Sequence, residues 1–144
     1  MESLVKITPD SIDSDRLLAY LTESEGGAID IFLGTTRRFT AGRETVSLSY
    51  EAAPNLAEKE IQKILSDAAR KWPLIRAAIV HRTGLVPVNE ASVFIGVATE
   101  HRSEAFSACR FLIDELKKRV PIWKREKFCD GSEEWVQGVT PSGD

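Results

Sequence analysis

The feature that most constrains the fold is a long helical pattern between Pro54 and Trp72. Apolar residues recur in this segment at three- and four-residue intervals: Leu56, Ile61, Ile64, Leu65, Ala68 and Trp72. Pro54 suits the first turn of a helix, where a backbone N–H is not needed. A second helical pattern begins near Ser103 and ends before Pro121, with an apolar stripe within 106–116. Two helices with one apolar face each require a surface against which both can pack.

Apolar and alternating segments predict the strands that supply this surface. AIDIFLG (28–34) and ASVFIGVAT (91–99) have the apolar content of buried strands, whereas VSLSYEA (46–52) alternates with period two. IRAAIVHRTG (75–84) predicts another strand, separated from 91–99 by a turn at Pro87 and Asn89. The chain therefore favours an α+β fold, a mostly antiparallel sheet with the two long helices packed on it.

The other segments are shorter. We expect a strand near Val5, a helix over 13–21, a polar loop over 35–45 and extended segments after residue 120. No repeat or linker interrupts the 144 residues, so residues 1–144 are predicted to be a single domain whose tail frays after about Val139.

Composition narrows the functional classes. No stretch approaches the roughly 18 apolar residues of a membrane span, and the acidic N-terminus lacks the pattern of a signal peptide. Cys109 and Cys129 have neither CxxC spacing nor the histidines of a zinc site, which favours a reducing, cytoplasmic location. The net charge of −3 and the absence of a reader motif argue against a nucleic-acid partner.

Charge is distributed unevenly along the chain. Residues 1–30 carry seven acidic and two basic side chains, whereas residues 101–127 carry eight basic and four acidic ones. The basic segment is either a solvated helix face or a surface that attracts an anion.

General catalytic motifs are absent from the sequence. It has no P-loop, no GxGxxG, no GxSxG elbow and no HExxH. With only His81 and His101 as histidines, no metal site is predicted, and the missing nucleotide-binding motifs mean that no cofactor is predicted either. Cys109 falls among apolar residues of the second long helix and is predicted to be a core residue rather than a nucleophile.

Cationic side chains instead gather at the predicted ends of elements. His101 and Arg102 lie where a strand gives way to a helix, and the N–H groups and dipole of a helix start attract phosphate. The alternative is a surface ion pair of Arg102 with Glu104. His81 and Arg82 end the preceding strand, and adjacent strand ends would place the two pairs side by side. His81 is then either a site residue or a hydrogen-bonded structural group.

Lys117 and Lys124 lie on either side of Pro121, which ends the helix and redirects the chain. The turn would bring the two ammonium groups together, partly buried against Trp123, and a lysine held neutral there acts as a nucleophile or proton shuttle. Alternatively, Lys117 only complements the helix dipole. Arg102 and Lys117 are fifteen residues apart on one helix, roughly 22 Å at the helical rise per residue. A small ligand that meets both must therefore bridge two subunits.

Six segments together resemble the molybdopterin synthase large-subunit family. They are FLGTTR (32–37), YEA (50–52), HRTG (81–84), EHRSEAF (100–106), LKKRVPIWKRE (116–126) and DGSEEWV (130–136). They run in the family's order and spacing over most of the chain. The pattern HRxxAF followed by LKxxxPxWKxE is the most specific part.

The resemblance implies an α/β hammerhead-type fold and a homodimer that binds a small ubiquitin-like sulfur carrier at each end, giving a heterotetramer. The carrier's C-terminal Gly-Gly tail bears a thiocarboxylate and enters a pocket of the large subunit. The implied activity is that of a sulfurtransferase of molybdenum cofactor biosynthesis. Two rounds of sulfur transfer convert cyclic pyranopterin monophosphate to molybdopterin.

The resemblance also assigns residues. The implied catalytic residues are Lys117, as acid/base or covalent-assisting group, and Lys124, which orients the thiocarboxylate. The implied substrate-binding residues are Thr35, Thr36, Arg37, His101, Arg102, Lys117, Lys124, Arg125 and Glu126. Many relatives have a lysine where this chain has Thr35, and Arg38 is placed to compensate.

Two other functions fit the same residues. A non-catalytic module would dock a ubiquitin-like protein on the basic surface without needing Lys117. A phosphate-ligand enzyme of another class would use a lysine to form a Schiff base. The order of motifs along the whole chain favours the synthase.

Overall fold

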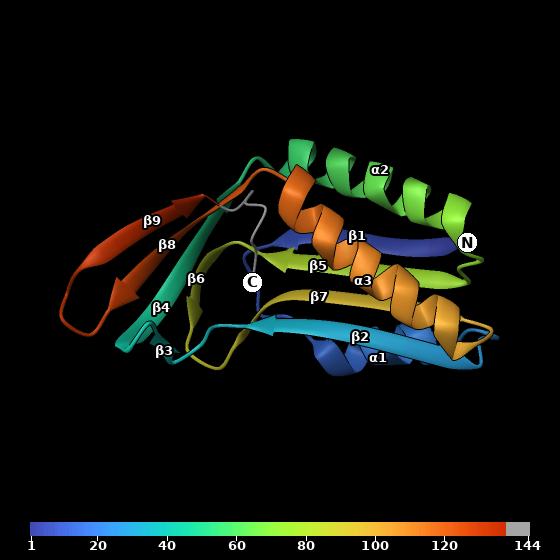
Figure 1. Ribbon diagram of the computed structural model, residues 1–144, viewed down its shortest axis with the longest axis horizontal. Helices are drawn as coiled ribbons and strands as arrows, with labels where there is room; N and C mark the ends of the chain where they lie inside the picture. The colour runs from blue at the N-terminus through green and yellow to red at the C-terminus, as the bar shows by residue number, and fades with distance from the viewer. Residues whose placement is uncertain (138–144) are drawn as a thin grey trace.

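The computed structural model describes residues 1–137 and forms two sheets and three helices (Figure 1). The elements are β1 (Glu2–Thr8), α1 (Ser14–Thr22), β2 (Ala28–Thr35), β3 (Phe39–Thr40), β4 (Arg43–Ala52), α2 (Pro54–Lys71), β5 (Arg76–Arg82), β6 (Gly84–Pro87), β7 (Ala91–Thr99), α3 (Arg102–Arg119), β8 (Ile122–Phe128) and β9 (Glu133–Gln137). The tail predicted to fray lies outside the described residues.

The first sheet has the strand order β1-β5-β7-β2. β1 and β5 are parallel, whereas β5 and β7, and β7 and β2, are antiparallel. Side chains of each strand alternate between the two faces. On β5, Ala77 and Ile79 pack with α2 and α3, whereas Ala78 and Val80 pack with α1.

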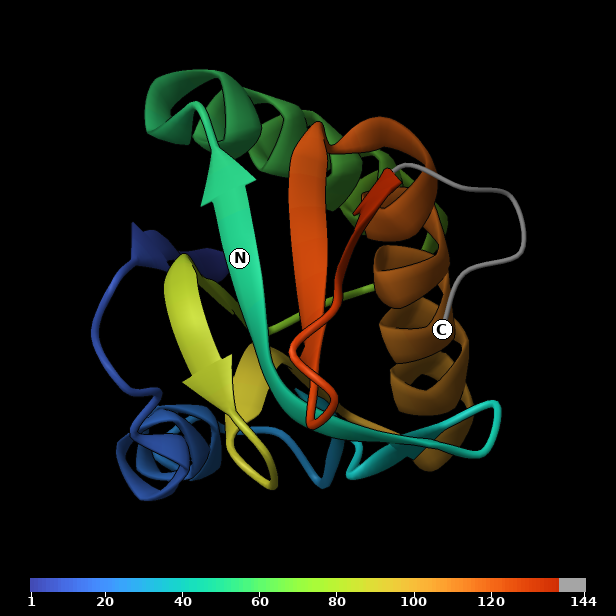
Figure 2. The ribbon, with the colours of Figure 1, turned by 90° about the vertical axis from the view of Figure 1, so that its left-hand side faces the viewer.

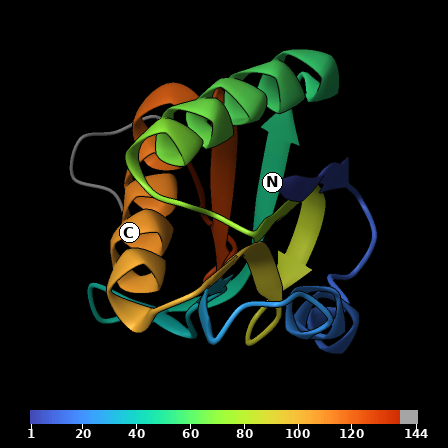
Figure 3. The ribbon, with the colours of Figure 1, turned by 90° about the vertical axis from the view of Figure 1, so that its right-hand side faces the viewer.

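The helices cover both faces of this sheet. α2 and α3 share one core with β5 and β7, and α1 packs on the opposite face through Leu17 and Leu21 (Figure 3). Gly96 allows this second contact, because a Cβ atom there would meet the Leu21 side chain and lie 2.9 Å from Phe94 Cε1. The first sheet is therefore buried along its centre.

The second sheet crosses one end of the first (Figure 2). Its order is β3-β4-β8-β9, and β6 also pairs with β4. The link from α3 to β8 is short, so the last turn of α3 lies beside the inner face of this sheet. Val120 in this link and Ile122 at the start of β8 are buried in the same core as the two long helices.

The predicted α+β class and the two long helices are confirmed, but the strands form two sheets rather than one. Two short strands were not predicted. β3 lies within the segment 35–45, which was wrongly predicted to be entirely loop, and pairs with the start of β4 across a turn at Ala41 and Gly42, both with positive φ. β6 follows β5 after a single residue, so the two read as one strand in the sequence.

Candidate functional site

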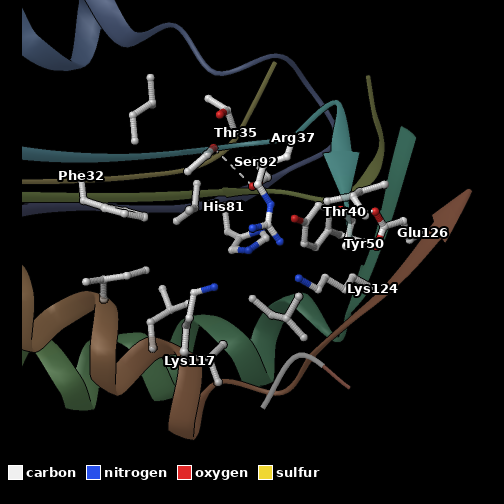
Figure 4. A pocket seen from close by; sticks show the side chains of 18 residues that line it. Phe32, Thr35, Arg37, Thr40, Tyr50, His81, Ser92, Lys117, Lys124 and Glu126 are labelled. Atoms are coloured by element: carbon white, nitrogen blue, oxygen red, sulfur yellow. Dashed lines mark hydrogen bonds between the residues drawn. The ribbon is translucent and has the colours of Figure 1, made fainter. Parts of the chain in front are cut away.

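A cavity of about 330 Å³ opens where the C-terminal end of α3 meets both sheets (Figure 4). One wall comes from the first sheet, at the end of β2, the end of β5 and the start of β7. The last turns of α3 form a second wall, and the inner face of β4 and β8 forms a third. Apolar side chains line much of it: Phe32, Leu33, Leu48, Val93, Ile113, Leu116, Val120 and Ile122. The cavity therefore suits a ligand with an organic ring as well as a charge.

Lys117 and Lys124 point into this cavity from two of its walls (Figure 4). Lys117 lies in the last turn of α3, and Lys124 lies in β8 just after the turn. The Val120 N–H donates to the Leu116 carbonyl at 3.0 Å and so caps the helix. The structure thus brings the two lysines into one cavity, as the position of the proline predicts.

Thr35, the last residue of β2, lines the cavity, and Arg37 approaches it from the segment that follows β2. The pairing of β2 with β7 shifts register between Gly34 and Thr35, and the chain then leaves the sheet. Arg37 directs its guanidinium toward the interior (Figure 4). The cavity thus receives three cationic side chains from three separate elements or loops, an arrangement that favours an anionic ligand.

Glu126 is the acidic side chain of the cavity wall and is only 9% exposed. Its Oε2 accepts hydrogen bonds from the hydroxyls of Thr40, at 2.9 Å, and Thr45, at 2.6 Å. These bonds join β8 to the β3–β4 hairpin, and this hairpin follows Arg37 in the chain. Glu126 therefore holds the segment 37–40 against the cavity.

Tyr50, His81 and Ser92 form an uncharged polar part of the wall. The rings of Tyr50 and His81 pack edge to face with centroids 5.1 Å apart. Burial raises the pKa of Tyr50, and the nearby Glu126 acts in the same direction. Burial lowers the pKa of His81 to about 4 against a hydrogen bond to the Arg82 carbonyl, and the charge of Lys117 lowers it further. Both rings are therefore neutral near pH 7.

Three residues that were predicted to form or adjoin the site lie outside the cavity. Thr36 is buried outside the cavity, and its hydroxyl donates to the Val86 carbonyl at 3.2 Å. Arg125 and Trp123 alternate with Lys124 along β8 and so face the other side of the sheet. Arg125 lies over the Trp135 ring, 5.2 Å from its centroid, and Trp123 is 47% exposed. The expected burial of the lysines against Trp123 is wrong for this reason.

His101 and Arg102 lie at the opposite end of α3 from Lys117 and are exposed. The predicted proximity of this pair to His81 and Arg82 is wrong, because β5 and β7 are antiparallel: His81 pairs with Val93 near the start of β7. The N-cap residue of α3 is His101, and its side chain makes no capping hydrogen bond. The first turn of α3 thus keeps its N–H groups available to a ligand.

The predicted core position of Cys109 is confirmed. Its side chain is 3% exposed between α3 and β7, and burial raises the pKa of the thiol to about 12. Among residues 1–137, no group of three or more His, Cys, Asp or Glu side chains converges as metal ligands would. No helix in the same range is long and apolar enough to cross a membrane.

Several cavity residues were not predicted from the sequence: Phe32, Thr40, Tyr50, Ser92 and Ile113. Tyr50 had a detectable signal, because the period-two pattern of 46–52 puts it on one face with Leu48. The register then places Tyr50 directly opposite Lys124. Ser92 and Thr40 carry no such signal, since their positions depend on how the two sheets meet.

Comparisons with known proteins identify the family. The family described as MoaE protein matches residues 7–119. The Bos taurus molybdopterin synthase catalytic subunit is 43% identical over 134 residues, covering 93% of this chain and 71% of that protein. The crystal structure of molybdopterin synthase from Staphylococcus aureus superposes with a TM-score of 0.84 at 34% identity, covering 90% of this chain and 94% of the other. A complex of subunits 1 and 2 of the molybdopterin-converting factor from Helicobacter pylori shares the fold, with a TM-score of 0.75 at 22% identity over 92% and 88% of the two chains.

The fold and the cavity define a class of α+β proteins whose cationic pocket lies between a helix end and two sheets. The chain belongs to the MoaE protein family, whose relatives above include molybdopterin synthase catalytic subunits. The family and the enzyme class implied by the sequence motifs are thereby confirmed.

Proposed function

We propose that this chain moves sulfur from the C-terminal thiocarboxylate of a small ubiquitin-like subunit to cyclic pyranopterin monophosphate, forming the dithiolene of molybdopterin. The observation that carries the proposal is the convergence of Lys117, Lys124 and Arg37 on one cavity with apolar walls. A pterin phosphate and a thiocarboxylate tail are both anionic, and each has an apolar or planar part that such walls accept. The sulfur arrives on the partner, which fits a cavity without a cysteine in its lining.

The positions of the two lysines support different roles. Lys117 lies on the helix wall across from His81 and is proposed to act as the acid/base or covalent-assisting group at the reacting carbons. Lys124 lies on β8 opposite Tyr50 and is proposed to hold the thiocarboxylate and the negative charge that develops on it. Loss of sulfur leaves a carboxylate on the partner, so each round also requires one oxygen atom from water or substrate.

His101 and Arg102 are proposed to bind the substrate phosphate in the pocket of a neighbouring subunit. β2 forms the edge of the first sheet and exposes Ile31, Phe32 and Leu33 by more than a third each. Phe106 of α3, the helix that contacts β2, is 59% exposed. Apolar side chains on an open edge strand are typical of an interface.

The direction of β2 supports the shared site. β2 and α3 both start near Thr99 and both end at the cavity, since Ala28 pairs with Thr99 and Thr35 lines the cavity. An antiparallel pairing of β2 with its copy about a two-fold axis would bring the partner's start of α3 beside this end of β2. The same surface thus accounts for both a homodimer and a complete phosphate site.

The partner subunit is proposed from the cavity and from the comparison with Helicobacter pylori, where subunits 1 and 2 of the molybdopterin-converting factor form a complex. One small subunit on each end of the homodimer would give a heterotetramer. A cytoplasmic location stays a prediction from the cysteine content.

Reconstitution tests the function. The chain is mixed with a thiocarboxylated ubiquitin-like subunit and cyclic pyranopterin monophosphate, and molybdopterin is measured as its fluorescent oxidation product. We expect product only with all three components, and none with Lys117→Ala, whose folding and partner binding should be unchanged. Lys118→Ala is the matched control, because Lys118 is the next residue on the same helix and is not part of the cavity wall. Partner binding without product would favour a docking module instead.

A further inference from the structure

His81, in the uncharged part of the cavity wall, has no role in the proposed sulfur transfer. His81 lies on β5, on the same face as Ala77 and Ile79, and is the last residue of this face before the strand ends. It is 5% exposed and lines the cavity beside Tyr50 and across from Lys117 (Figure 4). A polar ring in this position either serves the fold alone or contacts the ligand.

The orientation of the His81 ring is fixed by two contacts. Nδ1 lies 2.9 Å from the Arg82 carbonyl oxygen, and the Tyr50 ring packs edge to face against the imidazole. A carbonyl oxygen can only accept a hydrogen bond, so Nδ1 carries the proton. In a neutral imidazole the other nitrogen, Nε2, then has a free lone pair and is an acceptor.

The surroundings keep this ring uncharged. Burial and the positive charge of Lys117 both disfavour the protonated imidazole, and Lys124 and Arg37 line the same cavity. A fourth cation would be repelled by these three groups. His81 is thus a neutral acceptor in a cavity whose other nitrogen-bearing side chains are all donors.

We propose that His81 contacts the substrate through Nε2 as a hydrogen-bond acceptor, reading an N–H or O–H group of the pterin while the cations hold the anionic groups. This inference rests on the proposed function, since it needs a ligand that carries both an anion and ring N–H donors. A reduced pterin phosphate has both. The donor side chains of the cavity cannot distinguish such a ring from another organic phosphate, whereas an acceptor with a fixed direction can.

Two substitutions separate this role from a structural one. His81→Gln places an amide near the position of Nε2 and so keeps an acceptor for the substrate. His81→Asn places its amide near the position of Nδ1, which keeps the bond to the Arg82 carbonyl but loses the Nε2 acceptor. The two variants have similar polarity, and the thermal midpoint of each is measured to compare the effect on the fold.

Steady-state kinetics with the reconstituted system give the expected result. kcat/KM for the pterin should fall roughly tenfold to a hundredfold in His81→Asn, as expected when a buried hydrogen-bonding group loses its partner. His81→Gln should stay within about a few-fold of the wild type, and the affinity for the small subunit should not change in either variant. A His81→Asn enzyme with wild-type kcat/KM would overturn the proposal. An inactive wild type would instead refute the proposed function.

A measurement on the wild-type protein does not depend on how the variants fold. The chain has two histidines, so ¹⁵N-histidine labelling gives few signals, and those of the exposed His101 are identified by their absence from a His101→Gln variant. Before substrate is added, His81 Nε2 should show the downfield shift of an unprotonated nitrogen. Addition of the pterin phosphate without the small subunit should move this signal upfield, as a new hydrogen bond requires. An unchanged signal at saturating substrate would contradict the proposal.

Discussion

If two subunits share one active site, two kinds of mixed dimer that carry the same two substitutions should have opposite activities. Arg102 and Lys117 lie fifteen positions apart on α3, which separates them by roughly 22 Å. Arg102→Ala removes charge-assisted bonds to the phosphate, which are worth about 1.5–3 kcal/mol, or roughly 10- to 150-fold in rate. Lys117→Ala should abolish product. In a dimer that combines one subunit of each variant, a shared architecture restores one complete site and leaves the other without either residue.

The assay uses two affinity tags and tandem purification, so that every dimer contains one subunit of each kind. We expect about half of the wild-type activity per dimer, although both parental homodimers are nearly inactive. The reciprocal pairing combines a wild-type subunit with an Arg102→Ala/Lys117→Ala subunit and should be nearly inactive, because each site then lacks one residue. If each subunit holds a complete site of its own, the two results exchange. Inactive mixed dimers in the first experiment and half-active ones in the second would refute the shared site.

Three further predictions concern stability. The pKa of His81 is about 4 in the folded protein and 6.5 as a free side chain. Between these pH values the unfolded chain binds a proton that the folded chain does not, so the free energy of unfolding should fall by up to about 3 kcal/mol as the pH drops from 6.5 to 4. Urea titrations across this range should show the slope, and His81→Phe should lose most of it. Glu126→Leu should lower the free energy of unfolding by about 1–3 kcal/mol, because two threonine hydroxyls lose their acceptor; an unchanged denaturation midpoint would contradict this. Gly96→Ala should lower the free energy of unfolding by about 1–3 kcal/mol, because the added methyl group overpacks β7 against Leu21. Gly42→Ala is the control: a Cβ atom there has no other atom within 4 Å but sits on a residue with positive φ, so this variant measures backbone strain without a clash.

Much of the fold follows from local patterns. The three- and four-residue intervals predict α2 and α3 closely, and the apolar run 91–99 coincides with β7. These elements are buried along one face or both, so the pattern of apolar residues in the sequence shows which faces are buried. β3 has only two residues, and Thr40 pairs with Arg43 just three positions later in the chain, so the segment is too short to show a periodic pattern. The division into two sheets depends on pairings between distant strands, such as β4 with β8.

The site was predicted less completely, and two errors were avoidable. A connection of eight residues between β5 and β7 is too short for a parallel crossover, so the strands had to be antiparallel and their ends opposed. Strand alternation likewise separates Arg125 from Lys124 and Glu126. In contrast, the burial of Thr36 and the position of Ser92 in the cavity arise from tertiary contacts that no local pattern encodes.

The short link between α3 and β8 also limits how this site can change in evolution. Lys117 and Lys124 belong to one continuous stretch whose middle, at Val120 and Ile122, is buried. The spacing of the two ammonium groups is therefore set by the local geometry of residues 117–124 and depends little on substitutions in the rest of the protein. A single-residue insertion after Pro121 would turn Lys124 to the outer face while leaving every side chain present. Descendants of this chain can thus exchange residues in this stretch but can hardly alter its length.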